Sequence, residues 1–111
     1  MSLCDMSSRE TPISEPVYFI LLSLFSRPLH GYALMKEIKG LSAGRVTVTT
    51  GTLFGAIKRM LRDGWIEPFA QADTSRDKQS YALTLLGRQR LEIEIRRLRE
   101  LTAAASHLQE G

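Results

Sequence analysis

The sequence predicts a mainly α-helical fold with a small β-wing, in which a winged helix-turn-helix is followed by a long C-terminal helix. Apolar residues at helical spacing mark the helices, and two short runs, 65–72 and 78–84, are predicted to be the paired strands of the wing. With 111 residues, the chain has the size of a single domain. We therefore expect a flexible N-terminal segment at 1–13, the winged helix-turn-helix at 14–83 and the C-terminal helix at 84–111.

The first helix is predicted to begin after Ser14 and to end near Phe25. Ser14 can cap the helix, Glu15 and Pro16 fit its first turn, and Pro28 prevents its continuation. Its apolar residues cover several faces, with Val17, Ile20, Leu21 and Leu24 on one and Tyr18, Leu22 and Phe25 on others. A helix of this kind is buried on several sides, which indicates a second contact surface beyond its own core.

The second helix is predicted at Leu29–Leu41, LHGYALMKEIKGL, because its apolar residues recur at helical spacing. His30, near its start, is interpreted as a cap or packing residue, since the other histidine, His107, is distant in the sequence. The run RVTVT that follows, Arg45–Thr49, alternates β-branched residues and therefore predicts a short strand.

The third helix is predicted at about 49–63 and has two distinct faces. At 100° per residue, the apolar line comprises Leu53, Ile57 and Met60. The opposite face comprises Gly51, Gly55, Lys58 and Arg62. Glycine on a solvated helix face costs roughly 1 kcal/mol relative to alanine. Two glycines there indicate that a large surface comes close to the backbone.

A DNA groove is such a surface, because threonine hydroxyls and the N–H groups of a helix N-terminus suit phosphates. Residues 45–80 also hold six basic against four acidic side chains, a net charge of +2. We interpret the third helix as a recognition helix whose first turns enter a major groove. The candidate DNA-binding residues are Thr49, Thr50, Thr52, Phe54, Gly55, Lys58, Arg59 and Arg62 in the helix, with Arg76, Lys78 and Gln79 at the wing tip.

Plainer interpretations stay open for parts of this face. Lys58 and Arg62 could be ordinary solvated charges, as on most surface helices, and Gly51 could only relieve crowding at the cap. In the wing, Asp73 and Asp77 dilute the positive charge. The order of the elements nevertheless favours a recognition helix, since this helix lies where a helix-turn-helix requires it.

The C-terminal helix is expected to begin after Thr84 and to run to about His107. A helix of about 23 residues extends roughly 35 Å, which is more than the rest of this small domain can cover. Part of its apolar stripe should contact a second subunit. The candidate dimer-contact residues are Tyr18, Leu22, Phe25, Leu91, Ile95, Leu98, Leu101 and Ala105. The glutamates of this helix, Glu94 included, are interpreted as part of a solvated, ion-paired face.

An effector pocket would have to use Tyr18, Phe19 or Phe25, because the last helix has no aromatic residue. Trp65 is expected to close the core beneath the third helix, the alternative being that it lines such a pocket. Pro68 places its strand at the edge of the sheet.

No residues with the spacing of a catalytic or metal-binding site are evident, so we expect neither an enzyme nor a cofactor nor a metal. The single cysteine, Cys4, excludes an intrachain disulfide and fits a reducing cytoplasm. The most apolar run, Val17–Phe25, is too short to span a bilayer, and no signal peptide is evident.

Three stretches, Ile20–Leu41, Thr49–Glu67 and Tyr81–Leu91, together resemble the PadR family of bacterial transcriptional regulators. The most specific features are HGY at the start of the second helix and GTL…RMLRDGWI in the third, and the length resembles that of the compact subgroup with a single C-terminal helix. The resemblance implies a homodimer, formed by the last helix against the first helix and its own mate, that binds a palindromic operator in double-stranded DNA. It also implies repression relieved by a small hydrophobic or aromatic effector.

The sequence departs from the family pattern at three places. The family usually has tyrosine where Phe54 stands, often has proline in place of Gly55, and has two tyrosines in the wing where this chain has Tyr81 alone. Phe54 can pack or contact a thymine methyl group but cannot donate a hydrogen bond. A winged-helix module that binds protein rather than DNA is the alternative function, and it would not require positive charge on the third helix.

Overall fold

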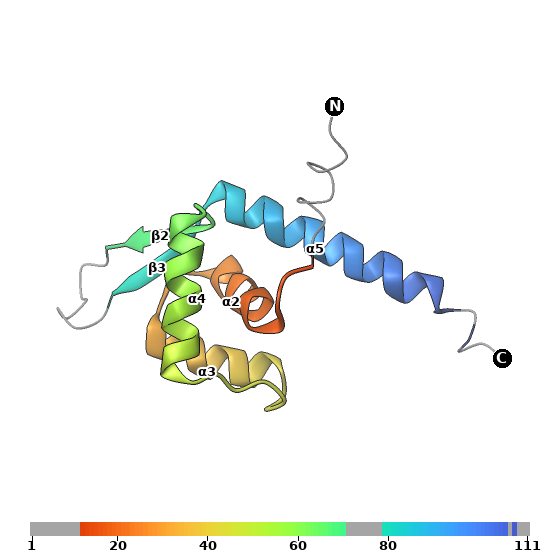
Figure 1. Cartoon of the computed structure of the whole chain (residues 1–111), viewed down its shortest axis with the longest axis horizontal. Coiled ribbons are helices and arrows are strands. Elements are labelled where there is room, and N and C mark those ends of the chain that lie inside the picture. The colour runs from red at the N-terminus through yellow and green to blue at the C-terminus, as the bar shows by residue number, and fades with distance from the viewer. Residues whose placement is uncertain (1–11, 71–78, 107, 109–111) are drawn as a thin grey trace.

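The computed structural model describes residues 12–70, 79–106 and 108, and it confirms the predicted fold (Figure 1). The elements are α2 (Glu15–Ser26), β1 (Leu29–His30), α3 (Gly31–Leu41), α4 (Thr50–Arg62), β2 (Ile66–Phe69), β3 (Ser80–Leu83) and α5 (Leu85–Ala104). In Figure 1, α3 and α4 form the helix-turn-helix, β2 and β3 extend as the wing, and α5 runs away on the other side. The structure is thus mainly helical, with a small antiparallel sheet and a long C-terminal helix.

The four described helices each begin at a side chain that caps the backbone. The capping residues Ser14, His30, Thr49 and Thr84 accept hydrogen bonds from the N–H groups of Val17, Ala33, Thr52 and Gly87. Such a cap satisfies one of the N–H groups that a helix start leaves without a partner. The predicted helix starts at Ser14, Thr49 and Thr84 are therefore confirmed, and so is the capping role of His30.

Two predictions about strands are wrong. Leu29 and His30 form strand β1 rather than the first turn of a helix, because they pair with Tyr81 and Ser80 of β3. Arg45–Thr49 forms no strand, although its residues favour one. The hydroxyl of Ser42 accepts a hydrogen bond from the Val46 N–H at 2.9 Å, so this backbone belongs to the turn after α3.

The sheet has the strand order β1-β3-β2, so β2 is an edge strand. Pro68 of β2 lies opposite Tyr81 of β3. An edge position suits proline because proline has no N–H to donate. The prediction for Pro68 is confirmed, while β1 extends the expected two-stranded wing on the side of the core.

The core lies between α2, α3, α4 and the first half of α5. Its fully buried side chains include Ile20, Leu21, Leu34, Ile38, Leu53, Ile57, Met60, Ile66 and Leu91. Gly87 lets α5 pass close to the chain before β2, since a Cβ at this position would clash with the Trp65 carbonyl. The second half of α5 leaves the core, and Leu101 is 57% exposed. In the described residues, no helix is long and apolar enough to cross a membrane.

The face of α5 that carries Glu94 is not the solvated face that we predicted. Glu94 is only 2% exposed, and its carboxylate accepts two hydrogen bonds from Arg97, at 2.6 and 3.0 Å. The hydrogen bonds from Arg97 hold the pKa of Glu94 below its usual value, and a hydrogen bond from the backbone of Ile13 acts in the same direction. Arg90 is also buried, and its guanidinium lies 5.6 Å from the centroid of the Trp65 ring. The ionic residues of α5 therefore help to hold Ile13 and Trp65, which lie far apart in the sequence.

Candidate nucleic-acid interface

The two faces of α4 have the burial that the sequence predicts. Leu53, Ile57 and Met60 are at most 2% exposed and pack into the core. Gly51, Lys58, Arg59 and Arg62 are exposed on the other side. Because α4 lies along the outside of the helix-turn-helix (Figure 1), this second face is open to a large partner.

The glycines of the open face have no steric reason within the protein. A Cβ added at Gly51 would meet no atom within 4 Å, and one added at Gly55 would meet only Nη1 of Arg59, at 3.9 Å. Alanine would favour the helix at both positions. The absence of side chains at Gly51 and Gly55 therefore leaves room for a partner molecule to approach the backbone of α4.

The threonines at the start of α4 divide into a cap and two further hydroxyls. Thr49 caps the helix by accepting from the Thr52 N–H at 3.1 Å, and its hydroxyl donates to the Thr52 hydroxyl at 3.0 Å. Thr50 is exposed beside them. Thr49 thus has a structural role, while the hydroxyl groups of Thr50 and Thr52 are better placed to donate to a phosphate.

The cations of α4 are weakly engaged within the protein. Arg62 forms an exposed ion pair with Asp63 at 3.4 Å. Exposed pairs of this kind contribute about 0–1 kcal/mol, so Arg62 can exchange its partner at little cost. Within the described ranges, Lys58 and Arg59 form no ion pair. The basic charge of this face is therefore available to an anionic partner.

Phe54 is half-buried and lies at the junction of α3 and α4. A Cβ at Gly31 would come within 2.5 Å of Phe54 Cζ, so the ring lies directly on the backbone where α3 begins. The same ring meets Tyr32 edge to face, with 6.3 Å between centroids and 70° between planes. We predicted Phe54 to be a DNA-binding residue, on a shoulder of the outward face of the helix. Gly31 and Tyr32 were not among the predicted site residues, although both belong to the HGY motif.

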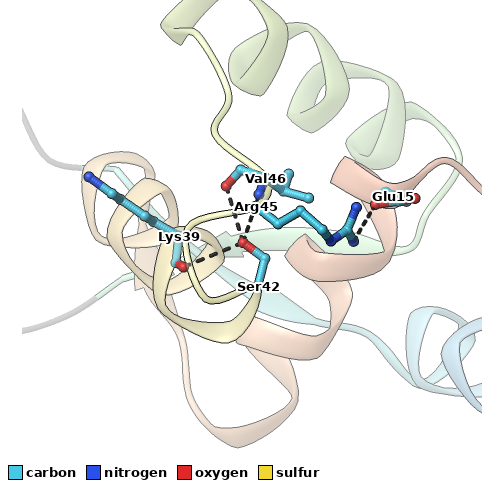
Figure 2. A network of polar contacts seen from close by, with 5 residues as sticks. All are labelled: Glu15, Lys39, Ser42, Arg45 and Val46. Carbon is cyan, nitrogen blue, oxygen red and sulfur yellow. Dashed lines mark hydrogen bonds and ion pairs between the residues drawn. The ribbon is translucent and has the colours of Figure 1, made fainter.

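The connection between α3 and α4 is held by a polar network that we did not predict (Figure 2). Ser42 lies between the backbone of Lys39 and that of Val46, and it binds both. Arg45 forms a 2.7 Å ion pair with Glu15 at the start of α2. Because this connection leads directly into α4, the network helps to position the N-terminus of α4.

Of the candidate DNA-binding residues in the wing, the structure describes Gln79. Gln79 is exposed, and its side-chain amide donates to the Ser80 carbonyl at 2.8 Å. The predictions for Arg76 and Lys78, and for the acidic residues Asp73 and Asp77, lie outside the described residues.

The predicted dimer-contact residues lie in α2, in α5 and, for Ala105, directly after α5. Leu91 is 1% exposed and packs in the core of the single chain, so little of its side chain is left to contact a second subunit. The others are half-buried (Tyr18, Leu22, Ile95 and Leu98) or exposed (Phe25, Leu101 and Ala105).

Two shallow hollows adjoin this surface. Tyr18, Ile95, Leu98 and Arg99 line one, and Phe25, Ile95 and Arg99 line the other. Phe19, the third residue expected near an effector, packs against the core and meets Tyr18 edge to face.

A helix-turn-helix, an outward helix with basic residues and an adjoining β-wing together define the class of winged helix-turn-helix proteins. Residues 20–93 match the model of the transcriptional regulator PadR-like family. The chain therefore belongs to the PadR-like family, whose members are DNA-binding transcriptional regulators and not enzymes.

Solved structures share this fold. A PadR family transcription regulator from hypervirulent Clostridium difficile has 21% identity and a TM-score of 0.71, and the match covers 86% of this chain and 99% of that chain. A PadR-like transcription factor from Bacteroides fragilis has 21% identity and a TM-score of 0.68, with 96% and 99% covered. A PadR-like transcriptional regulator from Bacillus cereus has 20% identity and a TM-score of 0.69, with 86% and 91% covered. No curated protein matches the chain significantly.

Proposed function

We propose that this regulator is a homodimeric repressor that acts in the cytoplasm and binds a palindromic operator through α4 and the wing. The open face of α4 carries the proposal, because it combines two positions without side chains, Gly51 and Gly55, with the cations Lys58, Arg59 and Arg62. A major groove requires both close approach to the backbone and positive charge near phosphates.

Selection of bound DNA from a random pool by the purified protein tests the proposal. We expect a palindrome whose half-sites are about one helical turn apart, because a two-fold symmetric dimer reads a two-fold symmetric site. Affinity for the selected operator should fall steeply with salt, since several phosphate contacts release counterions. Failure to select any sequence, or a flat salt response, would instead favour the protein-binding winged-helix module.

Gly55→Ala should separate stability from DNA binding. The substitution is expected to raise the free energy of unfolding by about 0.5–1 kcal/mol, because alanine favours a helix interior. It should also weaken operator binding roughly tenfold, equivalent to about 1.4 kcal/mol, because the methyl group obstructs the approach of the groove. Thermal unfolding and fluorescence anisotropy measure the two effects. Gly40→Ala in α3 is the matched control, since a Cβ at Gly40 would meet nothing within 4 Å. It should stabilise the protein without weakening DNA binding, and equal losses of affinity would refute the close approach.

Leu98→Glu should weaken dimerisation. Leu98 is half-buried on the surface shared by α2 and α5, and a carboxylate there would be desolvated between subunits. We expect the dimer dissociation constant to rise by roughly tenfold or more in sedimentation experiments. Gln89→Glu adds the same charge on the opposite side of α5, at 180° by helical spacing, and should leave the dimer intact. An unchanged dimer in Leu98→Glu would remove the last helix from the interface.

We further propose that a small aromatic or hydrophobic effector relieves repression, and the hollows beside the same surface support this proposal. Tyr18 and Phe25 offer aromatic contacts, and Arg99 reaches both hollows. A small aromatic compound that binds here would change how α2 meets α5 of the other subunit, and so the spacing of the two α4 helices. Thermal-shift screening with Tyr18→Ala as the comparison would locate such a compound.

A further inference from the structure

Packing of the core does not explain why the ring of Tyr32 is exposed. Tyr32 lies in the first turn of α3 and is 61% exposed, although tyrosine has a large apolar ring. Its ring lies beside α4, in edge-to-face contact with Phe54. Within the part of the chain that the structure describes, its hydroxyl makes no hydrogen bond.

The position of the Tyr32 ring is fixed by the helix that faces the DNA in the proposed function. Gly31 allows the Phe54 ring to lie on the start of α3, because any Cβ there would clash with Phe54 Cζ and Cε1, at 2.5 and 2.9 Å. Edge-to-face contact is the geometry that aromatic pairs prefer. Phe54 therefore holds the neighbouring Tyr32 ring beside the N-terminal half of α4.

A tyrosine hydroxyl in this place has a natural acceptor on DNA. When the second helix of a helix-turn-helix lies in the major groove, the first helix crosses the phosphate backbone. Tyrosine hydroxyls are among the groups that donate to phosphate oxygens and so fix the register of a protein on the duplex. The alternative is that the Tyr32 ring only shields Phe54 from water, in which case its hydroxyl has no role.

We propose that the Tyr32 hydroxyl donates a hydrogen bond to a DNA phosphate beside each half-site, and that Phe54 is the positioning residue that holds the Tyr32 ring for this contact. The inference rests on the proposed function and extends the DNA-binding surface from α4 to the start of α3. It also gives Phe54 a role that requires a flat ring but no hydroxyl.

Tyr32→Phe tests the contact, because it keeps the ring and removes only the hydroxyl. We expect affinity for the selected operator to fall about 10- to 100-fold, because the dimer loses one hydrogen bond to a phosphate at each of two half-sites and each bond contributes at least about 3- to 10-fold. The salt dependence should stay as steep as in the wild type, since no cation is removed. Affinity within twofold of the wild type would overturn the inference while leaving the proposed function intact. Absence of DNA binding by the wild type would overturn both.

A modified operator identifies the acceptor. Replacing one phosphate at a time by an uncharged methylphosphonate should reveal a position at which the wild type loses more affinity than Tyr32→Phe does. A role in folding alone would not produce this difference, so equal losses at every phosphate would refute the contact.

The double variant tests the role of Phe54. Phe54→Leu keeps an apolar side chain but removes the ring that holds Tyr32, and it should weaken binding about as much as Tyr32→Phe. If Phe54 acts through Tyr32, Tyr32→Phe combined with Phe54→Leu is no weaker than either single variant. Additive losses, measured at a temperature at which all variants are folded by circular dichroism, would refute the positioning role.

Discussion

Replacing Lys58 and Arg62 together with alanine is expected to lower operator affinity about 100-fold or more at ~0.1 M salt, while the melting temperature changes by no more than about 4 °C. Each cation that neutralises a phosphate contributes about 0.9 to the slope of log affinity against log salt concentration. With two cations in each of two subunits, the slope should become less steep by roughly 3 to 4. The small thermal effect follows because Lys58 has no ion pair among the described residues and the Arg62–Asp63 pair is exposed.

Lys36→Ala combined with Lys39→Ala is the matched control for this prediction. Both lysines are exposed on α3, so the control removes the same net charge from the same helix-turn-helix. An equal loss of affinity in the control would mean that the overall charge of the domain, and not the α4 face, attracts DNA. A large fall in the melting temperature of the Lys58 and Arg62 variant would mean that these side chains support the fold.

The faces of α4 could be predicted because local sequence determines them. Thr49 caps the helix, the chain leaves it at Asp63, and the apolar line from Leu53 to Met60 points to the core. Helical periodicity and capping involve residues that are close in sequence. They can therefore be predicted without knowledge of contacts between distant parts of the chain.

Strand β1 could not be predicted, because a two-residue strand has no periodicity of its own. Leu29 and His30 extend only because β3, some 50 residues later in the sequence, supplies their partners. The opposite error occurred at Val46, where β-branched residues have no strand beside them and Ser42 holds the backbone instead. Strand propensity is a preference for a half-buried, paired environment, and it has no effect where that environment is missing.

The contact between Phe54 and the start of α3 could not be predicted from helical periodicity either, because it depends on how two helices cross. Spacing alone placed Phe54 on a shoulder of the outward face. Because Gly31 has no side chain, the Phe54 ring can lie against the start of α3. This contact depends on how α3 packs against α4, which the sequence alone does not show. Glu94 differs, because it lies at helical spacing from Leu91 and Leu98 and so could have been assigned to the buried side.

Glu94→Gln is expected to destabilise the protein by about 2 kcal/mol at neutral pH, with the melting temperature falling by roughly 8 °C or more. The neutral amide of glutamine has only one oxygen, so it cannot accept both hydrogen bonds from Arg97. Its NH₂ group would face an N–H donor of Arg97 that the second carboxylate oxygen of Glu94 now accepts from. Glu92→Gln is the matched control, two residues away and on another face of α5. Glu92 is exposed, so its replacement should change stability by no more than about 0.5 kcal/mol.

The effect of Glu94→Gln should depend on pH in a definite direction. The pKa of Glu94 is lowered in the folded state by its hydrogen bonds from Arg97, so the stabilisation is fully present above the pKa of an unfolded glutamate, about 4. It is lost as the pH falls below that value and through the lower pKa of the folded state. Denaturant unfolding of both proteins should therefore give a constant stability difference between about pH 5 and 8 that narrows below pH 4. A difference that stays constant down to pH 3 would show that the substitution acts through packing and not through the charge of Glu94.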